Sequence, residues 1–402
     1  MLELEDAVER ILEKAPPPLP EEIPLNESYG RFLARTVYSV VDLPLFDNSA
    51  MDGYAARAED IASAHAESPV RLSVIGRAPA GEVFPGQVSP GTCVRVFTGS
   101  ALPMGANAVV MQEDTRAVGE HGKEVLVLSS VKPWENIRLK GEDLKAGQEL
   151  APAGVKLTPA RLGLLAACGC ARVTVGRQPV VGLLATGSEL REPGQTLQPG
   201  QIYDSNRILL STLVSEAGAL PKVLSLVPDT FEDTRQALVN AFEACDVVVS
   251  SGGVSVGEMD FVKRAFEEKG GLLQFWKVAI KPGRPFVFGR AGGKMFFGLP
   301  GNPVSALVTF LLLVRPALLR WQGAREVQLR KQPGVLAEPL MNPGERRHFF
   351  RVNQDAEGRA YSAGLQASHI LSSLAAANGL VDVPPRTTFP EGLEVKVLTW
   401  HG

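Results

Sequence analysis

The sequence predicts a multidomain protein of the α/β plus β class. A central, mainly parallel α/β sheet domain is accompanied by a β-rich inserted domain and a small C-terminal β-barrel or sandwich. Three observations predict this fold. Apolar, β-branched runs alternate with helical segments across residues 179–325, as in a parallel sheet covered on both faces. Short apolar runs broken by Gly and Pro fill residues 40–175, which is typical of strands and turns. Helical periodicity is lost after residue 325.

The chain has 402 residues, which is long enough for several domains. Residues 1–15 repeat apolar side chains at helical spacing, and the proline-rich segment 16–20 ends this short helix. Changes in the pattern of apolar, glycine and proline residues along the chain then predict four domains. These are a discontinuous stem in residues 1–45 and 143–178, a β-rich inserted domain in 46–142, an α/β domain in 179–325 and a C-terminal β domain in 326–402.

The α/β segment is predicted element by element from its apolar runs. Strands are expected at residues 180–184, 223–227, 246–250, 274–280, 286–288 and 295–298. Helices are expected after Ser205 and at residues 230–244, 259–268 and 303–321. Ser205 is expected to cap the first of these helices, and Pro303 occupies a favoured first-turn position in the last. The residues expected to face inward from the first helix are Ile208, Leu209, Leu213 and Val214.

Composition limits the classes of partner and compartment. The chain carries 41 Lys and Arg against 44 Asp and Glu, and this balance excludes a general basic coat for nucleic acid. Residues 304–319 are too short for a bilayer span and include Arg315 and Pro316. Residues 1–10 are acidic and amphipathic, unlike a secretory leader. We therefore expect a soluble, cytoplasmic protein with no membrane partner.

The chain has four cysteines, a usage that suits a reducing compartment. Cys168 and Cys170 form a C-x-C pair inside a run of small, apolar residues. A metal pair is conceivable there, but free cysteines prefer the protein interior, and two buried small side chains are the favoured interpretation.

Glycine-rich loops follow three of the predicted α/β strands. Glycine lets backbone N–H groups approach an anion, and a helix N-terminus adds positive partial charge. In an open α/β sheet such loops meet at the carboxyl ends of the strands. One loop alone is better explained as a tight turn, but three at one edge favour a phosphate or oxyanion cradle. The loop residues expected to contact the anion are Thr186, Gly187, Ser188, Ser251, Gly252, Gly253 and Ser255.

The same edge is expected to collect the carboxylates Glu189, Asp204, Asp229 and Asp260. Asp204 and Asp229 could each simply cap a helix. As a group, however, these acids would repel a phosphorylated ligand unless a cation intervened. Hard oxygen ligands beside a phosphate are typical of Mg²⁺, so the cluster predicts a magnesium site.

Basic residues oppose these acids. If residues 274–280 form one strand, Lys277 lies on one of its faces while Lys281 and Arg284 project from its carboxyl end. Lysine and arginine are usually solvated, but a set that directly follows a buried strand favours a role in holding a dianion. The tail residues Arg346, Arg347 and Arg351 add a weaker case for positive charge.

Composition assigns no function to two further polar segments, around residues 47–55 and 96–100. Eight segments nevertheless occur together in the order typical of one family, the bacterial molybdopterin molybdenumtransferases of the MoeA type. Those segments are 48–55 (NSAMDGYA), 97–99 (FTG), 141–143 (GED), 185–190 (ATGSEL), 203–206 (YDSN), 251–257 (SGGVSVG), 281–285 (KPGRP) and 299–305 (LPGNPVS). The chain resembles this family over nearly its whole length, and the E domain of gephyrin is similar.

The resemblance implies a homodimer of four-subdomain chains that transfers molybdenum from molybdate onto adenylyl-molybdopterin. The resemblance further implies that AMP is released in a Mg²⁺-dependent step. It also implies contact with the adenylylating enzyme and with other proteins of cofactor biosynthesis. The ligand supplies the sulfur atoms, so no side chain needs to act as a covalent nucleophile. Molybdate and tungstate are both tetrahedral dianions of similar size, and the residues predict no preference between them.

Carried over residue by residue, the resemblance implies that Asp52 and Thr98 approach the reaction from one subunit, supported by Asp143. Catalytic and metal roles in the α/β cleft fall to Glu189, Asp229 and Asp260. The ligand-binding residues that it implies besides the loops are Lys277 and Lys281 for the anionic ligand, Pro300 and Pro303 for the pocket wall, and Arg351 and Ser372 for molybdate.

Two alternatives remain at this stage. One is a molybdopterin adenylyltransferase that uses ATP, and the other is a non-enzymatic scaffold. The adenylylating relatives carry a Gly-Gly-Thr-Gly loop where this chain has Gly253-Val254-Ser255, a difference that favours insertion. Retention of the full set of acids and bases disfavours a pure scaffold.

Overall fold

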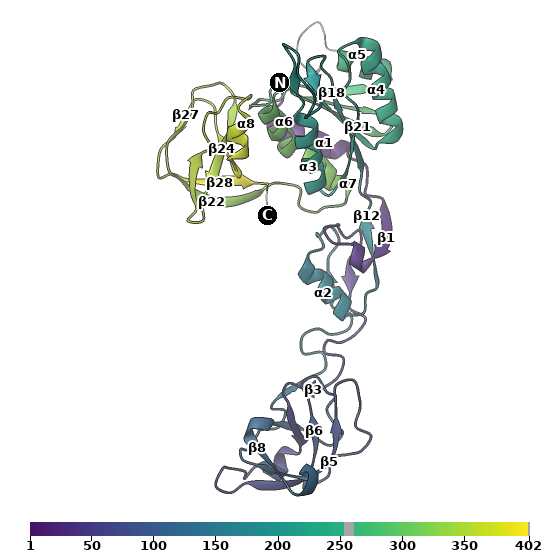
Figure 1. The fold of residues 1–402 in the computed structure, drawn as a ribbon, viewed down its shortest axis with the longest axis vertical. Coiled ribbons are helices and arrows are strands. Elements are labelled where there is room, and N and C mark those ends of the chain that lie inside the picture. The colour runs from purple at the N-terminus through teal and green to yellow at the C-terminus, as the bar shows by residue number, and fades with distance from the viewer. Residues whose placement is uncertain (253–260, 401–402) are drawn as a thin grey trace. The chain divides into compact units, whose positions relative to one another are not determined.

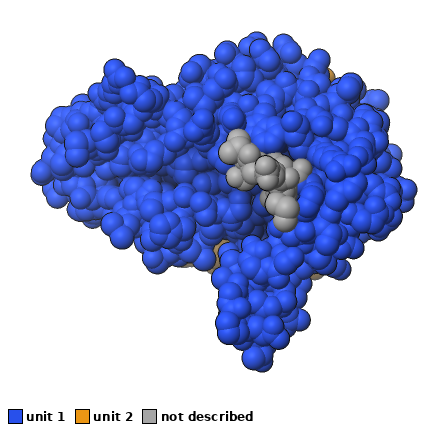
Figure 2. Space-filling model, turned by 90° about the horizontal axis from the view of Figure 1, so that it is seen from above, with its two compact units in different colours: residues 1–35, 153–157, 172–402 blue, residues 36–152, 158–171 orange. Residues whose placement is uncertain are grey.

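The computed structural model describes residues 1–252 and 261–400, and the chain falls into two compact units. Unit 1 comprises residues 1–35, 153–157 and 172–402, and unit 2 comprises residues 36–152 and 158–171 (Figure 2). The predicted fold class is confirmed, because the chain combines a mixed α/β sheet, a β-rich unit and a C-terminal barrel. The four predicted domain boundaries stay a prediction.

The core of unit 1 is a six-stranded sheet in the order β16-β13-β17-β21-β20-β18 (Figure 1). Its strands are β16 Leu220–Val223, β13 Val180–Ala185, β17 Val247–Ser251, β21 Lys294–Leu299, β20 Val287–Ala291 and β18 Leu272–Trp276. The first four run parallel to one another. Strand β20 pairs antiparallel with both β21 and β18, so β20 runs opposite to the other five strands of this sheet. Ala185 pairs with Ser251, and Ser251 pairs with Leu299. Three strands therefore end side by side at one carboxyl edge.

Successive buried residues of the strands point to opposite faces of this sheet, so both faces are apolar. Helices cover both of them (Figure 1). Val247 and Val249 of β17 face the larger core, with α1 Leu4–Lys14, α3 Asn206–Glu216 and α6 Pro303–Thr309. Val248 faces the second core, with α4 Phe231–Ala244 and α5 Phe261–Glu268. All three valines are fully buried. Each such side chain contributes about 1.5–3 kcal/mol relative to its exposed state.

The predicted helix over residues 303–321 is confirmed. It consists of α6, the π-helical turn Phe310–Val314 and α7 Arg315–Trp321. Among the described residues, this is the one helix long and apolar enough to cross a membrane, and 89% of its apolar window is buried within the protein. Such burial is typical of a core helix.

The C-terminal region is a closed barrel, one of the two architectures predicted. Strands β24-β25-β22-β28-β26 pair in that order, and β24 also pairs with β26. Their bounds are β22 Arg330–Leu336, β24 Arg347–Gln354, β25 Arg359–Ser362, β26 Gly379–Val383 and β28 Glu394–Thr399. Phe350 and Val352 fill the barrel interior. Phe349 lies on the opposite side of β24 and joins the core of the α/β sheet, so the barrel and sheet share buried surface.

Shorter elements complete unit 1. These are β1 Pro20–Pro24 paired with β12 Arg172–Gly176, β14 Leu190–Arg191 paired with β15 Ile202–Tyr203, β23 Leu340–Asn342 paired with β27 Thr387–Phe389, helix α8 Leu371–Ala375 and the 3₁₀ turn Leu25–Glu27.

Unit 2 is built on a second six-stranded sheet, in the order β7-β4-β6-β5-β9-β8. Its strands are β4 Gly53–Ala56, β5 Val70–Ala78, β6 Thr92–Val96, β7 Ala108–Met111, β8 Thr115–Val118 and β9 Glu124–Val127. Gly53 is required because a Cβ there would lie 1.9 Å from the Val110 carbonyl oxygen. The remaining elements are β2 Val37–Tyr38 with β11 Glu149–Ala151, β3 Asn48–Ser49 with β10 Ile137–Arg138, helix α2 Pro159–Ala167, and 3₁₀ turns Ala58–Ile61, Gln112–Asp114 and Glu120–Gly122.

The expected strand over residues 274–280 is wrong. Strand β18 ends at Trp276, because Lys277 adopts a left-handed backbone conformation with φ +77°. The chain then forms β19 Ile280–Lys281, which leaves the α/β sheet and pairs in parallel with β24 of the barrel. Lys281 consequently belongs to the barrel rather than to the sheet. The strand expected at 223–227 is also displaced, and β16 occupies Leu220–Val223.

Candidate functional site

The carboxyl edge of the α/β sheet brings the loops after β13, β17 and β21 together, as their predicted positions required. The amide of Thr186 donates to the Ser251 carbonyl at 3.4 Å, and the Gly252 amide donates to the Leu299 carbonyl at 3.1 Å. Gly252 has φ +88°, and a Cβ there would lie 3.1 Å from the Thr186 carbonyl oxygen. Only glycine satisfies this position without strain.

Two of the predicted carboxylates lie on neighbouring loops at this edge. The amide of Asp229 donates to Ser188 Oγ at 3.1 Å, and the Gly187 amide donates to the Val227 carbonyl at 3.1 Å. The Glu189 carboxylate folds back on its own loop, since a Cβ at Gly187 would lie 2.6 Å from Glu189 Oε2. Both acids are at least partly exposed to solvent. The arrangement supplies oxygen donors of the kind that Mg²⁺ prefers.

The third predicted metal ligand, Asp260, lies outside the described residues, as do Gly253 and Ser255. Within the residues that are described, no group of three or more His, Cys, Asp or Glu side chains could hold a metal ion. The magnesium site therefore stays a prediction resting on Glu189 and Asp229.

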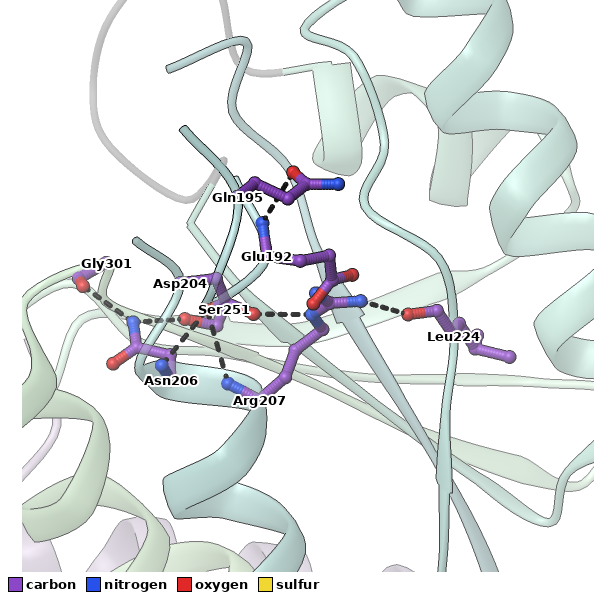
Figure 3. Close-up of polar contacts among 8 residues, drawn as sticks. All are labelled: Glu192, Gln195, Asp204, Asn206, Arg207, Leu224, Ser251 and Gly301. Carbon is purple, nitrogen blue, oxygen red and sulfur yellow. Dashed lines mark hydrogen bonds and ion pairs between the residues drawn. The ribbon is translucent and has the colours of Figure 1, made fainter. Parts of the chain in front are cut away.

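Helix α3 begins at the same edge, and its cap differs from the prediction. The Ser205 side chain makes no capping hydrogen bond. Asp204 Oδ1 instead accepts from the amides of Asn206 and Arg207, at 3.0 and 3.3 Å (Figure 3). Ile208, expected to face inward, is 58% exposed, whereas Leu210, Leu213 and Val214 are buried.

Basic side chains gather where β19 meets β24 of the barrel. Lys281 pairs in register with His348, and Arg346 donates to the Ile280 carbonyl at 2.8 Å. Burial, reinforced by the charges of Lys281, Arg351 and Arg346, lowers the pKa of His348 to about 3. We call Lys281, Arg346 and Arg351 the cation cluster. Arg347 is not part of it, because Glu5 and Asp382 both pair with its guanidinium.

Arg351 is fully buried. Its Nε donates to Ser373 Oγ at 2.9 Å, and its Nη2 donates to the Leu365 carbonyl at 2.7 Å. Among the described residues, Nη1 has no hydrogen-bond partner and no carboxylate lies within ion-pair distance of this guanidinium. Burial lowers the pKa of Arg351 accordingly. A buried cation that lacks an anion is electrostatically incomplete.

The cation cluster lies close to the loop after β21. Asn302 of that loop donates to Ser368 Oγ at 3.0 Å, and Ser368 adjoins the Leu365–Ala367 segment whose carbonyls accept from Arg351. Pro300 in this loop is buried, and Pro303, the first residue of α6, is half-buried. Ser372 is exposed, whereas the neighbouring Ser373 contacts Arg351. Ser373 and His348 were not singled out by the sequence.

Unit 2 carries the remaining predicted residues. Asp52 Oδ1 accepts from both the amide and the hydroxyl of Thr98, each at 2.8 Å, and these bonds hold the pKa of Asp52 below its usual range. Arg95 lies 5.0 Å from the Tyr54 ring centroid and 5.3 Å from that of Phe97. The amide of Asp143 donates to the Leu43 carbonyl at 3.0 Å.

Comparison with known proteins settles the family. Family models match the MoeA N-terminal region (domain I and II) over residues 2–169, a probable molybdopterin binding domain over 182–320 and the MoeA C-terminal region (domain IV) over 333–400. The chain belongs to the MoeA family. The resemblance inferred from the eight sequence segments is thus confirmed.

Individual relatives extend over almost the whole chain. The molybdopterin molybdenumtransferase of Haemophilus influenzae is 41% identical, across 94% of this chain and 93% of that protein. The Bacillus subtilis protein of the same name is 36% identical, across 98% and 93%. The crystal structure of the molybdopterin biosynthesis MoeA protein of Pyrococcus horikoshii OT3 has a TM-score of 0.83 at 33% identity, and covers 99% of this chain and 100% of that one.

Proposed function

We propose that this MoeA-family chain is a molybdopterin molybdenumtransferase, which inserts molybdenum from molybdate into adenylyl-molybdopterin and releases AMP. Family membership and the shared name of its relatives support this function. The observation that carries it in the structure is the buried Arg351, whose Nη1 has no partner among the described residues. An oxyanion would complete the hydrogen bonding of this guanidinium.

The two sides of the site suit the two substrates. Backbone amides of the glycine loops and the N-terminus of α6 can hold the phosphate of the pterin. The cation cluster can hold the molybdate dianion beside the pterin dithiol. The two sulfur atoms form new bonds to molybdenum while one oxo ligand of molybdate leaves as water with the two thiol protons, so molybdenum keeps its oxidation state. Water cleaves the phosphoanhydride bond, and AMP leaves. Preorganised charge of this kind typically stabilises a transition state by about 3–4 kcal/mol per donor.

We further propose that Glu189 and Asp229 hold Mg²⁺, with Asp260 as a third ligand. When bound, Mg²⁺ would neutralise charge on the phosphoanhydride and polarise it. Glu189 and Asp229 lie on adjacent segments joined through Ser188, and this proximity supports their sharing one ion. Asp229 or Asp260 would orient the attacking water.

The decisive experiment supplies purified protein with adenylyl-molybdopterin, molybdate and Mg²⁺, and measures molybdenum incorporated and AMP released. We expect both products in equal amounts. Arg351→Gln should reduce molybdenum insertion by about 100-fold, as expected for loss of one preorganised donor. Arg235→Gln is a matched control, because Arg235 pairs with Glu232 on the exposed side of α4. Insertion that proceeds normally in Arg351→Gln would remove the cation cluster from the reaction.

The alternative of an ATP-dependent adenylyltransferase is tested by omitting molybdate. Incubation with ATP and molybdopterin should yield no adenylyl-molybdopterin if the proposal is correct. A homodimer and a cytoplasmic location complete the proposal, and sedimentation analysis of the purified chain tests the first of these.

A further inference from the structure

The first turn of α3 links the loops that form the proposed site. We propose that Asn206 and Arg207 are positioning residues that set the two halves of this site separately. In this proposal Asn206 fixes the glycine loops that receive the phosphate, and Arg207 fixes the segments that carry Glu189 and Asp229. The inference rests on the proposed function and adds two residues to it.

Asn206 joins two glycine loops through one carboxamide (Figure 3). Its side-chain nitrogen donates to Ser251 Oγ at 2.6 Å and to the Gly301 carbonyl at 2.7 Å. Ser251 ends β17 and Gly301 follows β21, so both hydrogens of the amide bridge neighbouring loops. The residue is only 8% exposed, and its Oδ1 is buried without a partner among described groups. The spacing between these loops therefore depends directly on Asn206.

Arg207 reaches in a different direction (Figure 3). Its Nη2 donates to Glu192 at 2.6 Å, and its Nη1 donates to the Leu224 carbonyl at 2.5 Å. Glu189 directly precedes the short strand β14 and Glu192 directly follows it, and Leu224 begins the segment that leads to Asp229. Arg207 thus ties together the two segments that carry the proposed metal ligands.

Asp204 anchors both residues. It is 3% exposed, accepts from the amides of Asn206 and Arg207, and receives the Arg207 Nε at 2.5 Å. Burial alone lowers the pKa of Arg207, but the hydrogen bonds to Asp204 and Glu192 outweigh it and raise the pKa overall. Arg207 therefore stays charged while it connects the two acidic segments. A residue that only capped α3 would not need contacts with Glu192 and Leu224.

The two residues predict two different kinetic signatures. Asn206→Ala should raise KM for adenylyl-molybdopterin by about 10-fold and leave the Mg²⁺ concentration for half-maximal rate unchanged. Arg207→Met should raise that Mg²⁺ concentration by about 10-fold and change KM for the pterin by less than about 2-fold. Arg207→Lys should restore part of the Mg²⁺ affinity, because lysine keeps the charge but not the fork of donors.

Binding measurements separate this inference from the proposed reaction. Mn²⁺ replaces Mg²⁺ in titrations followed by electron paramagnetic resonance, and AMP serves as the phosphate probe in calorimetry. Mn²⁺ should bind Arg207→Met more weakly than wild type, and AMP should bind Asn206→Ala more weakly. These outcomes can hold even where no molybdenum is inserted, so failure of the function and failure of the inference are distinguishable.

Arg207→Met leaves Asp204 buried without its cation and can unfold. Glu192→Gln provides the second variant, because Glu192 is half-exposed and its loss removes only one of the Arg207 contacts. It should weaken Mn²⁺ binding in the same direction by about 3-fold. Asn240→Ala on the exposed side of α4 is the matched control. Equal changes in pterin and metal affinity in every variant, or no change in either, would overturn the proposal.

Discussion

The acidic and basic halves of the proposed site differ in how far their buried charges are paired with opposite charges. On the acidic side, Asp204 and Arg207 are buried, and each is paired within the described chain. On the basic side, Arg351 is equally buried but meets only carbonyls and a hydroxyl. A buried ion pair with its hydrogen bonds made is a support for structure, whereas a buried cation without an anion is suited to a ligand. The comparison assigns a scaffolding role to the Asp204–Arg207 pair and a ligand-binding role to Arg351.

The largest expected effect is the loss of stability when the Asp204–Arg207 ion pair of the acidic half is broken. Asp204→Asn leaves the Arg207 guanidinium buried with Glu192 as its one remaining anion. We expect the free energy of unfolding to fall by about 3 kcal/mol, because removal of one member of a buried pair strands the other charge. Urea denaturation measures this loss. A change below about 1 kcal/mol would show that the pair contributes little to the fold.

Removal of the buried charge of the basic half should reduce molybdenum insertion while leaving the free energy of unfolding nearly unchanged. Arg351→Met removes a buried charge that no described carboxylate pairs with, so the cost of the lost hydrogen bonds is largely offset. We expect the free energy of unfolding to stay within about 1 kcal/mol of wild type while molybdenum insertion is lost. Denaturation and insertion assays on one preparation test both statements. Joint loss of stability and activity would make Arg351 a scaffold residue.

Sequence reasoning predicted the loops of the site well for a physical reason. Parallel strands must end at the same edge, so strands at 180–184, 246–250 and 295–298 brought their glycine loops together wherever the exact boundaries fell. Lys277 lay beyond this reasoning, because no Gly or Pro marks the left-handed residue that ends β18. The transfer of Lys281 to the barrel is a tertiary effect that local periodicity does not encode.

Single side-chain contacts were less accessible from sequence. Asn206 and Arg207 sat inside or beside the YDSN segment, but helical spacing predicts only a face, not the loops that a side chain reaches. Ser372 and Ser373 are adjacent serines on a short helix, and only the course of the backbone decides which of them contacts Arg351. Asp204, and not Ser205, caps α3, and the same carboxylate also accepts a hydrogen bond from Arg207 Nε.

A smaller effect concerns His348, which lies beside the cation cluster and should make the stability of the protein depend on pH. The pKa of His348 is about 3 in the folded protein, below the value of about 6.5 expected when unfolded. A depressed histidine pKa means that the unfolded chain binds the proton more readily, so stability is lost as pH falls below 6.5 towards 3. The expected slope is up to about 1.4 kcal/mol per pH unit. His348→Leu should remove this part of the slope in denaturation curves, and parallel curves would contradict it.

The smallest expected effect lies in unit 2 and concerns Asp52. Thr98 donates twice to this carboxylate, so Thr98→Val should remove the hydroxyl bond while the amide bond remains. The pKa of Asp52 should rise towards its ordinary value without reaching it. A carboxyl chemical-shift titration by NMR measures this change. An unchanged pKa would mean that the amide bond alone lowers it.

The proposed oxyanion site rests on the cation cluster and on the buried Arg351 guanidinium within it. Calorimetric titration of molybdate into wild type and Arg351→Met tests it most directly, with Arg235→Gln as the control. We expect wild type and the control to bind molybdate alike and Arg351→Met to bind it at least about 10-fold more weakly. Equal affinity in all three proteins would contradict it.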